Sequence, residues 1–306
     1  MRKDSMARIL LAGTPKTTVQ VAEKLVESGH EIITVLCPFP KPVGRKKILT
    51  PSELELWAKE HTVPVIHVNK DLLQEKNTLR NKLPQTDLLV VADFGFLVPA
   101  WLLNFPQHKA LNLHPSLLPR WRGATPVPFT LLFGDKETGV TIIQMNEKFD
   151  QGGIVAQAPV KILSQDTTPL LLARAFDVGA RVLLEILPSY ISGNLKIVPQ
   201  LATSPTPTSP RLSKEDGFVP FSTLFHVGKT EAPLLAKFGL ETSAKTVERM
   251  VRALQPWPKV WTLLPNGKRM IVHQARMTSK GTLELEQVQL EGKTPVQFSE
   301  VKNQVM

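Results

Sequence analysis

Residues 8–36 read RILLAGTPKTTVQVAEKLVESGHEIITVL, in which two apolar runs flank an amphipathic stretch. The first run, Arg8–Ala12, predicts a short buried β-strand. Apolar residues recur with a helical period along Lys16–Ser28, and Gly29 is expected to end that helix. Glu31–Leu36 predicts the next strand. A strand–helix–strand unit of this kind is typical of a parallel sheet with helices on its faces.

The same alternation continues along the chain. Helices are predicted over Ser52–His61, with Ser52 as the N-cap, and over the long amphipathic segment Pro169–Leu187. Residues 37–51 are rich in Pro, Gly and Lys and predict a loop. The further predicted strands are Val63–Val68, Leu88–Ala92, Ala110–His114 and Val140–Met145. The expected fold class is therefore α/β, with a doubly wound, mostly parallel, Rossmann-like sheet.

The character of the sequence changes near residue 196. Residues 200–211 (QLATSPTPTSPR) are mainly Pro, Ser and Thr and predict an extended linker with little rigid structure. After it we expect a helix, a hairpin turn at Pro265-Asn-Gly and several short strands, over Ala244–Leu254, Val260–Leu264, Arg269–His273, Thr282–Gln289 and Val296–Val301. The sequence thus predicts a domain at 1–195, a linker at 196–212 and a small OB-like β-barrel domain at 213–306.

The composition narrows the class of protein. The 306 residues carry a net charge of +10, with 22 Lys and Arg against 18 Asp and Glu up to Leu195, and 15 against 9 from Lys196 onward. A basic chain attracts polyanions such as nucleic acid, although general solubility also explains the charge. The single cysteine, Cys37, excludes an intrachain disulfide and a multi-cysteine zinc site. The sequence has no apolar stretch of about 18 residues that would span a membrane.

The most informative stretch for chemistry is residues 111–123, LNLHPSLLPRWRG. Asn112 and His114 alternate at the end of a predicted strand, so their side chains leave on the same face. Ligands of doubly wound sheets bind beyond the carboxyl ends of the strands. An amide there can stabilise an oxyanion and an imidazole can move a proton, as acyl transfer requires. The alternative is a pair of polar residues that cap a strand.

A second candidate is Asp150, which follows the predicted strand Val140–Met145 and opens a Gly-rich turn. A carboxylate at this point could orient His114 and favour its protonated form. The alternative is an ordinary Asx-turn.

Two loops bear on the ligand. Residues 12–15 (AGTP) follow the first strand but lack both the G-x-G-x-x-G pattern and a P-loop lysine, which argues against NAD and ATP. The loop from Lys41 to Lys47 contains Arg45, Lys46 and Lys47 in succession. These cations could bind phosphates, or the loop could simply be solvated.

These residues together resemble the methionyl-tRNA formyltransferase family, within the wider group of folate-dependent formyltransferases. The resemblance covers nearly the whole chain, and the stretch HPSLLPRWRG is its most specific part. The other matching stretches are AGTP at 12–15, the basic loop, ADFGFLVP at 92–99, ETGVT at 137–141, LSKED at 212–216 and VERMVRALQPWP at 247–258. The sequence departs from the family at Gly153, where a second acidic residue is usual.

The resemblance implies transfer of a formyl group from 10-formyltetrahydrofolate to the amino group of methionyl initiator tRNA, for translation initiation. It implies a cytoplasmic monomer that needs no metal and has no membrane partner. Catalysis would rest on Asn112, His114 and Asp150. Folate would be bound by Phe94, Gly95, Phe96, Leu97, Ser116, Leu117, Leu118 and Pro119, and tRNA by Lys41, Arg45, Lys46, Lys47, Lys214, Arg249 and Arg252.

Two alternatives remain at this point. A folate-dependent formyltransferase for a small amine would share the N-terminal residues but would need no basic C-terminal domain. A non-catalytic tRNA-binding relative would not need Asn112, His114 and Asp150. A steep salt dependence of tRNA affinity would argue against the small-amine enzyme. Formyl transfer would exclude the non-catalytic relative.

Overall fold

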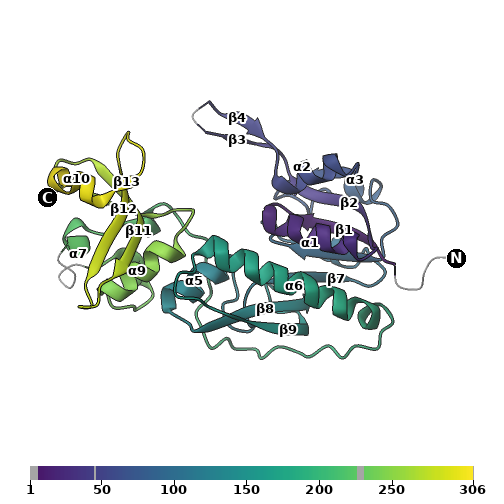
Figure 1. Ribbon diagram of the computed structural model, residues 1–306. Coiled ribbons are helices and arrows are strands. Elements are labelled where there is room, and N and C mark those ends of the chain that lie inside the picture. The colour runs from purple at the N-terminus through teal and green to yellow at the C-terminus, as the bar shows by residue number, and fades with distance from the viewer. Residues whose placement is uncertain (1–5, 45, 226–230, 306) are drawn as a thin grey trace. The chain divides into compact units, whose positions relative to one another are not determined.

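The computed structural model describes residues 6–44, 46–225 and 231–305. The chain forms two compact units (Figure 1). Unit 1 consists of Met1–Ala124, Thr138–Val160 and Leu172–Thr208, and unit 2 consists of Thr125–Glu137, Lys161–Leu171 and Ser209–Met306. Two short segments from the first two thirds of the chain therefore belong to the C-terminal unit. The division at residues 195 and 212 predicted from composition stays a prediction.

Unit 1 is built on a seven-stranded sheet in the order β5-β2-β1-β6-β7-β8-β9. The strands are β1 Arg8–Gly13, β2 Glu31–Pro38, β5 Val65–Val68, β6 Leu88–Ala92, β7 Ala110–His114, β8 Glu137–Gln144 and β9 Gly153–Lys161. The first five strands of this order pair in parallel, whereas β8 runs antiparallel to β7. The predicted mostly parallel α/β sheet is confirmed.

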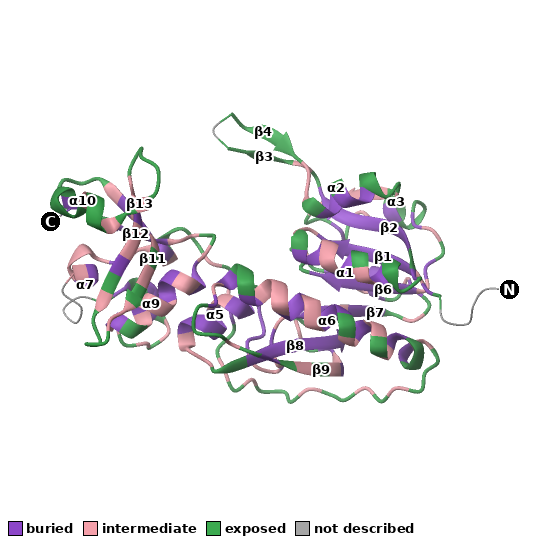
Figure 2. Ribbon diagram, in the orientation of Figure 1, coloured by how far each residue is buried: buried purple, intermediate pink, exposed green. Residues whose placement is uncertain are grey.

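Helices cover both faces of this sheet because successive side chains of a strand point to opposite faces. Ile9 and Leu11 of β1 pack with α1, α2 and α6, while Leu10 and Ala12 pack with α3 and α4. These helices are α1 Lys16–Glu27, α2 Glu53–Glu60, α3 Lys76–Arg80, α4 Ala100–Leu103 and α6 Thr168–Ile191. The central strands are buried along their length (Figure 2). Ser52 caps α2 as predicted, since its hydroxyl accepts a hydrogen bond from the Glu55 backbone N–H.

The prediction of a loop over residues 37–51 is wrong in part. β3 (Lys41–Val43) and β4 (Ile48–Thr50) form an antiparallel hairpin that extends from unit 1 (Figure 1). Every residue of the two strands is exposed. A hairpin that buries neither face shows no alternation of apolar and polar residues, so its sequence gives no strand signal.

Unit 2 contains a four-stranded antiparallel sheet, β10-β11-β12-β13, which confirms the predicted small β domain. α9 packs against β11 and β12, and α5 packs against α9. The strands are β10 Val260–Leu263, β11 Arg269–Met277, β12 Leu283–Leu290 and β13 Val296–Gln297, and the helices are α5 Pro126–Phe133, α7 Phe221–Phe225, α8 Pro233–Lys237, α9 Ala244–Ala253 and α10 Phe298–Val305. No helix in the described part of the chain is long and apolar enough to cross a bilayer.

One predicted strand of unit 2 is mostly helix. Val296–Val301 was expected to be extended, but the chain leaves β13 after Gln297 and begins α10 at Phe298. The Glu300 carboxylate accepts a hydrogen bond from the Gln297 backbone N–H and so stabilises the start of the helix. The apolar residues of this short run fit either period, and the cap decides between them.

Candidate active site

The predicted catalytic residues meet at the carboxyl edge of the sheet in unit 1. Asn112 and His114 lie on one face of β7, and Asp150 lies in the turn between β8 and β9. His114 is buried, with 4% of its surface exposed. Its Nδ1 is 3.7 Å from Oδ1 of Asp150. The structure therefore brings together an imidazole and a carboxylate that are 36 residues apart in the sequence (150 − 114).

The partner of the other ring nitrogen determines which atom of His114 can exchange a proton. Nε2 lies 3.1 Å from the backbone oxygen of Trp121. A carbonyl only accepts hydrogen bonds, so Nε2 must carry the proton and donate it. In the neutral ring Nδ1 is then the unprotonated nitrogen. When Nδ1 takes up a proton, the imidazolium faces the Asp150 carboxylate, which stabilises its charge.

Asp150 is fixed by backbone contacts on two sides. Its second carboxylate oxygen accepts a hydrogen bond of 2.9 Å from the Gly123 backbone N–H. Its own backbone has φ of +52°, in the left-handed region that non-glycine residues adopt at a cost of about 1–2 kcal/mol. Gln200 holds this conformation, because its side-chain NH₂ donates to the backbone oxygens of Asp150 (2.8 Å) and Gly152 (2.7 Å).

Gln200 is held in turn by Arg122. The guanidinium donates to Oε1 of Gln200 at 2.8 and 3.2 Å and to the next two backbone oxygens after it, at 2.7 and 3.1 Å. Further along, the Thr206 hydroxyl accepts a hydrogen bond from the Trp121 backbone N–H. The prediction that residues 200–211 have little rigid structure is therefore wrong. This segment is extended, but it is tied to the residues that surround His114.

Close packing explains why the turn after Asp150 contains two glycines, Gly152 and Gly153. A Cβ atom on Gly152 would lie 2.0 Å from the Gln144 backbone oxygen, so a side chain there would displace the main chain. A Cβ on Gly153 would lie 2.4 Å from Cγ2 of Ile197, the end of a flexible side chain. Gly152 is thus required by the backbone, whereas Gly153 is required only by the present position of Ile197.

Asn112 is half-buried and has an unused amide. Within the described part of the chain its side chain makes no hydrogen bond, although the neighbouring polar residues are paired. It lies two residues from His114 on the same strand, so both side chains face the same space beyond the sheet edge. An unpaired amide beside a proton-exchanging imidazole can donate to an oxyanion that forms there.

The predicted folate residues flank these side chains. Ser116–Pro119 follow β7 and Phe94–Leu97 follow β6, and the two strands are neighbours in the sheet. The Thr141 hydroxyl donates to the Ser116 backbone oxygen (2.6 Å) and accepts from the Leu118 N–H (3.0 Å), which fixes the first loop. Ser116 and Leu118 have buried side chains, so contact with a ligand would come from backbone atoms and from Leu117 and Pro119. The phenyl rings of Phe94 and Phe96 meet edge to face.

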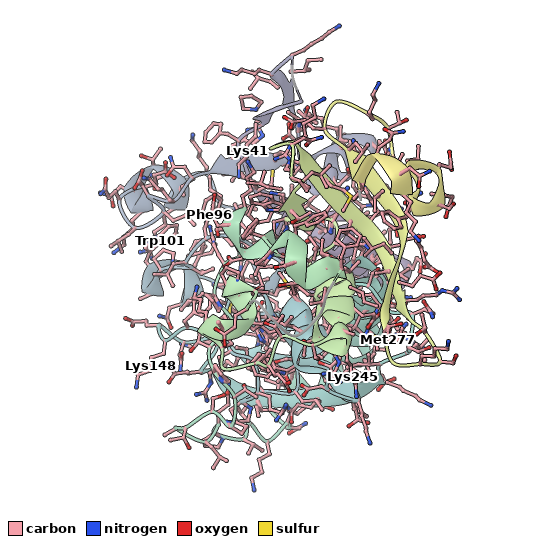
Figure 3. All side chains as sticks on the ribbon, turned by 90° about the vertical axis from the view of Figure 1, so that its left-hand side faces the viewer. Lys41, Phe96, Trp101, Lys148, Lys245 and Met277 are labelled. Atoms are coloured by element: carbon pink, nitrogen blue, oxygen red, sulfur yellow. The ribbon has the colours of Figure 1, made fainter. Side chains whose placement is uncertain are left out.

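The predicted tRNA residues differ in what surrounds them. Lys41, Lys46 and Lys47 are exposed on the β3–β4 hairpin, where Figure 3 labels Lys41, and Arg45 lies outside the described residues. In unit 2, Lys214 is exposed and its ammonium lies 5.9 Å from the centre of the Trp261 ring. The roles of all these residues stay predictions.

The two arginines of α9 are engaged in packing. Arg252 pairs with the Glu248 carboxylate and donates to the Asp166 backbone oxygen, and Arg249 donates to the Phe133 backbone oxygen. Both guanidinium groups are only partly accessible. Their contacts within unit 2 account for them without tRNA, so their predicted binding role gains no support from the geometry.

Comparison with known proteins identifies the family of this chain. Residues 7–187 match the family described as formyl transferase, and residues 236–282 match the formyl transferase C-terminal domain. The chain belongs to the formyl transferase family, as the sequence resemblance predicted.

Named relatives narrow the comparison further. Methionyl-tRNA formyltransferase of Bacillus velezensis is 35% identical over 267 residues, which cover 87% of this chain and 77% of that protein. The enzyme of the same name from Halalkalibacterium halodurans is 33% identical over 275 residues, with 89% and 79% coverage. A solved N-formyltransferase from Helicobacter canadensis, in complex with folinic acid and dTDP-3-aminofucose, superposes with a TM-score of 0.62 at 16% identity and covers 89% of this chain and 88% of its own. At 16% sequence identity, the similarity to this structure concerns the fold alone.

Proposed function

We propose that this protein is a methionyl-tRNA formyltransferase, which transfers the formyl group of 10-formyltetrahydrofolate to the amino group of methionyl initiator tRNA. The observation that carries the proposal is the arrangement at the end of β7. There an unpaired Asn112 amide lies beside a His114 ring whose Nδ1 is the nitrogen free to exchange a proton. The names and coverage of the relatives support the choice of substrate.

In the proposed reaction the methionyl amine attacks the formyl carbon. The new C–N bond forms as the carbonyl becomes an oxyanion, and the Asn112 amide donates a hydrogen bond to that oxygen. Nδ1 of His114 accepts a proton from the attacking nitrogen, and the Asp150 carboxylate stabilises the resulting imidazolium. When the oxyanion collapses, the bond to folate nitrogen 10 breaks and His114 returns the proton to that nitrogen. The products are formyl-methionyl-tRNA and tetrahydrofolate.

The folate donor fits the surroundings of these residues. The fixed backbone of Ser116–Pro119 offers hydrogen-bonding groups, and the half-buried Phe94 and Phe96 offer apolar surface on the neighbouring strand end. The exposed lysines of the β3–β4 hairpin are suited to the phosphates of the acceptor end, and Lys214 provides a further cation in unit 2. We place the enzyme in the cytoplasm, as a monomer.

A panel of amine acceptors tests the proposal. Purified protein and 10-formyltetrahydrofolate are incubated with methionyl initiator tRNA, methionyl elongator tRNA, free methionine and a nucleotide-linked amino sugar. We expect transfer to the initiator tRNA only. Transfer to the amino sugar would instead identify a small-amine formyltransferase, and tRNA binding without transfer would identify a non-catalytic relative.

A further inference from the structure

A second group of titratable side chains lies at the carboxyl edge of the same sheet, away from β7. Cys37 is near the end of β2, His67 is near the end of β5, and Glu55 is in the first turn of α2. Cys37 and His67 are register partners on adjacent parallel strands, so both side chains project on the same face. Glu55 approaches them from the helix above that face. All three belong to unit 1.

The ligand-forming atoms of these side chains converge. The Cys37 sulfur, a carboxylate oxygen of Glu55 and a ring nitrogen of His67 all lie within 4.8 Å of one another. It is the one group of three such residues in the part of the chain that the structure describes. Cys37 is fully buried, and the Glu55 side chain is 2% exposed.

Two of these atoms have no hydrogen-bond partner. Oε1 of Glu55 is bound by the Lys59 ammonium at 2.7 Å. Oε2 lies 3.1 Å from Nε2 of His67, within ion-pair distance, but the two buried atoms form no hydrogen bond with each other or with another described residue. Buried polar atoms that make no hydrogen bond destabilise the folded state. A carboxylate oxygen and an imidazole nitrogen at this distance, with no hydrogen bond between them, can bind the same ion.

We propose that Cys37, Glu55 and His67 bind a divalent transition-metal ion of the Zn²⁺ class. Thiolate, imidazole and carboxylate are the three ligand types that Zn²⁺ takes in proteins, and three protein ligands leave a fourth position for water. The ion would satisfy both unpaired atoms at once. The His67 side chain is 29% exposed, so the group lies just beneath the surface of unit 1.

A reactive cysteine is the competing interpretation of the same three residues. Burial raises the pKa of the Cys37 thiol to about 11, although a hydrogen bond with Ser52 acts in the other direction. A protonated and inaccessible thiol is a poor nucleophile. A bound metal ion would have the opposite effect on this thiol. Coordination deprotonates the thiol, and the charge of the ion compensates the charge of the thiolate.

The position of the group suggests what a bound ion does. Cys37 precedes β3 and Glu55 follows β4, so the ligands come from both ends of the hairpin segment. The ring of Phe39, between Cys37 and β3, stacks on the His67 ring with centroids 5.1 Å apart. An ion here would cross-link the two ends of the hairpin to β5.

Cobalt binding tests the proposal directly, with the full chain stripped of metal by a chelator. Co²⁺ adopts the same sites as Zn²⁺ and gives a charge-transfer absorption when a thiolate is a ligand. Because Cys37 is the single cysteine of the chain, that absorption has one possible origin. We expect the band to appear on Co²⁺ addition, to saturate stoichiometrically and to disappear when Zn²⁺ displaces the cobalt. Absence of the band from the wild-type protein would overturn the proposal, whatever the variants do.

Substitutions then assign the other two ligands. His67→Gln and Glu55→Gln should each weaken Co²⁺ binding by about tenfold or more, since even indirect partners of ligands cost that much. His61→Gln is the matched control, because His61 is exposed at the end of α2 and lies outside the group. Equal binding by all three variants would contradict the assignment. These readouts do not involve formyl transfer, so they stand or fall independently of the proposed function.

Discussion

Two pairs of imidazole and carboxylate lie at one edge of one sheet, and they differ in what else reaches the ring. In the pair at β7, Nε2 of His114 is bound to the Trp121 backbone oxygen and Asp150 is 3.7 Å from Nδ1. In the pair at β5, Nε2 of His67 is 3.1 Å from Glu55 and has no hydrogen-bond partner, and the Cys37 thiol lies beside it. A ring with one nitrogen engaged can exchange protons at the other. A ring whose unsatisfied nitrogen faces a thiol and a carboxylate can bind a metal.

The largest effect is expected when the charge that faces His114 is removed. Asp150→Asn keeps the size of the side chain and the acceptor for Gly123 but no longer stabilises an imidazolium. We expect the turnover of formyl transfer to fall by about 10²–10⁴-fold, the usual contribution of a positioned proton-transfer group. The KM for tRNA should stay within about twofold, because the charge acts on the transition state. A loss confined to KM would contradict this role.

The next effect concerns the residue that positions Asp150. Gln200→Ala removes the hydrogen bonds to the Asp150 and Gly152 backbone and the two that the Arg122 guanidinium donates to the Gln200 side chain. We expect turnover to fall by about 10-fold to 10²-fold through misplacement of the carboxylate. Gln151, which follows Asp150, is exposed and its side chain makes no hydrogen bond to the described residues, so Gln151→Ala provides the control. Equal rates for the two variants would show that the extended segment does not position the site.

A smaller effect is expected on the exposed hairpin. The double variant Lys46→Ala, Lys47→Ala should raise the KM for tRNA several-fold and reduce the slope of log affinity against log salt by up to about two. Turnover at saturating tRNA should not change. Lys76→Ala with Lys82→Ala removes two equally exposed lysines near α3 and controls for net charge. If both double variants behave alike, the hairpin lysines are only solvated.

The smallest effect concerns a buried histidine, His30, that forms no ion pair with a carboxylate of the described residues. His30 accepts a hydrogen bond from the Ala7 N–H, and burial lowers its pKa. The unfolded chain takes up this proton first, so its contribution to the free energy of unfolding falls as pH drops below about 6.5. His30→Gln should reduce the loss of stability between about pH 7 and 5, measured by denaturant unfolding. An unchanged pH dependence would mean that the pKa of His30 is the same in the folded and unfolded chain.

How far the sequence predicts these regions depends on whether the signal is local. β1, α1 and β7 follow from periodicity, and Asn112 and His114 follow from alternation at the end of a strand. Asp150 also lies after a predicted strand. Gln200 could not be found this way, because it stands in a stretch of Pro, Ser and Thr and its partners are about 50 and 78 residues away. The hairpin was missed because neither of its faces is buried.

The group at Cys37 shows the same limit. Its three members come from two strands and a helix, with unrelated spacings that match no metal-binding pattern. Only the register of β2 against β5 places Cys37 opposite His67, and register is a property of the folded sheet. The lone cysteine was informative for what it excludes, not for what it contacts.

The proposed proton transfer by His114 is tested most directly by finding which nitrogen of its neutral ring carries the proton. Two-dimensional ¹⁵N NMR of the imidazole nitrogens, with His114 assigned by comparison with the spectrum of His114→Gln, reports which nitrogen carries the proton. The hydrogen bond to the Trp121 backbone oxygen predicts the Nε2-protonated form, with Nδ1 free to accept a proton and face Asp150. A neutral ring protonated at Nδ1 would contradict the proposed role of His114, because the nitrogen that should accept the proton would already carry one.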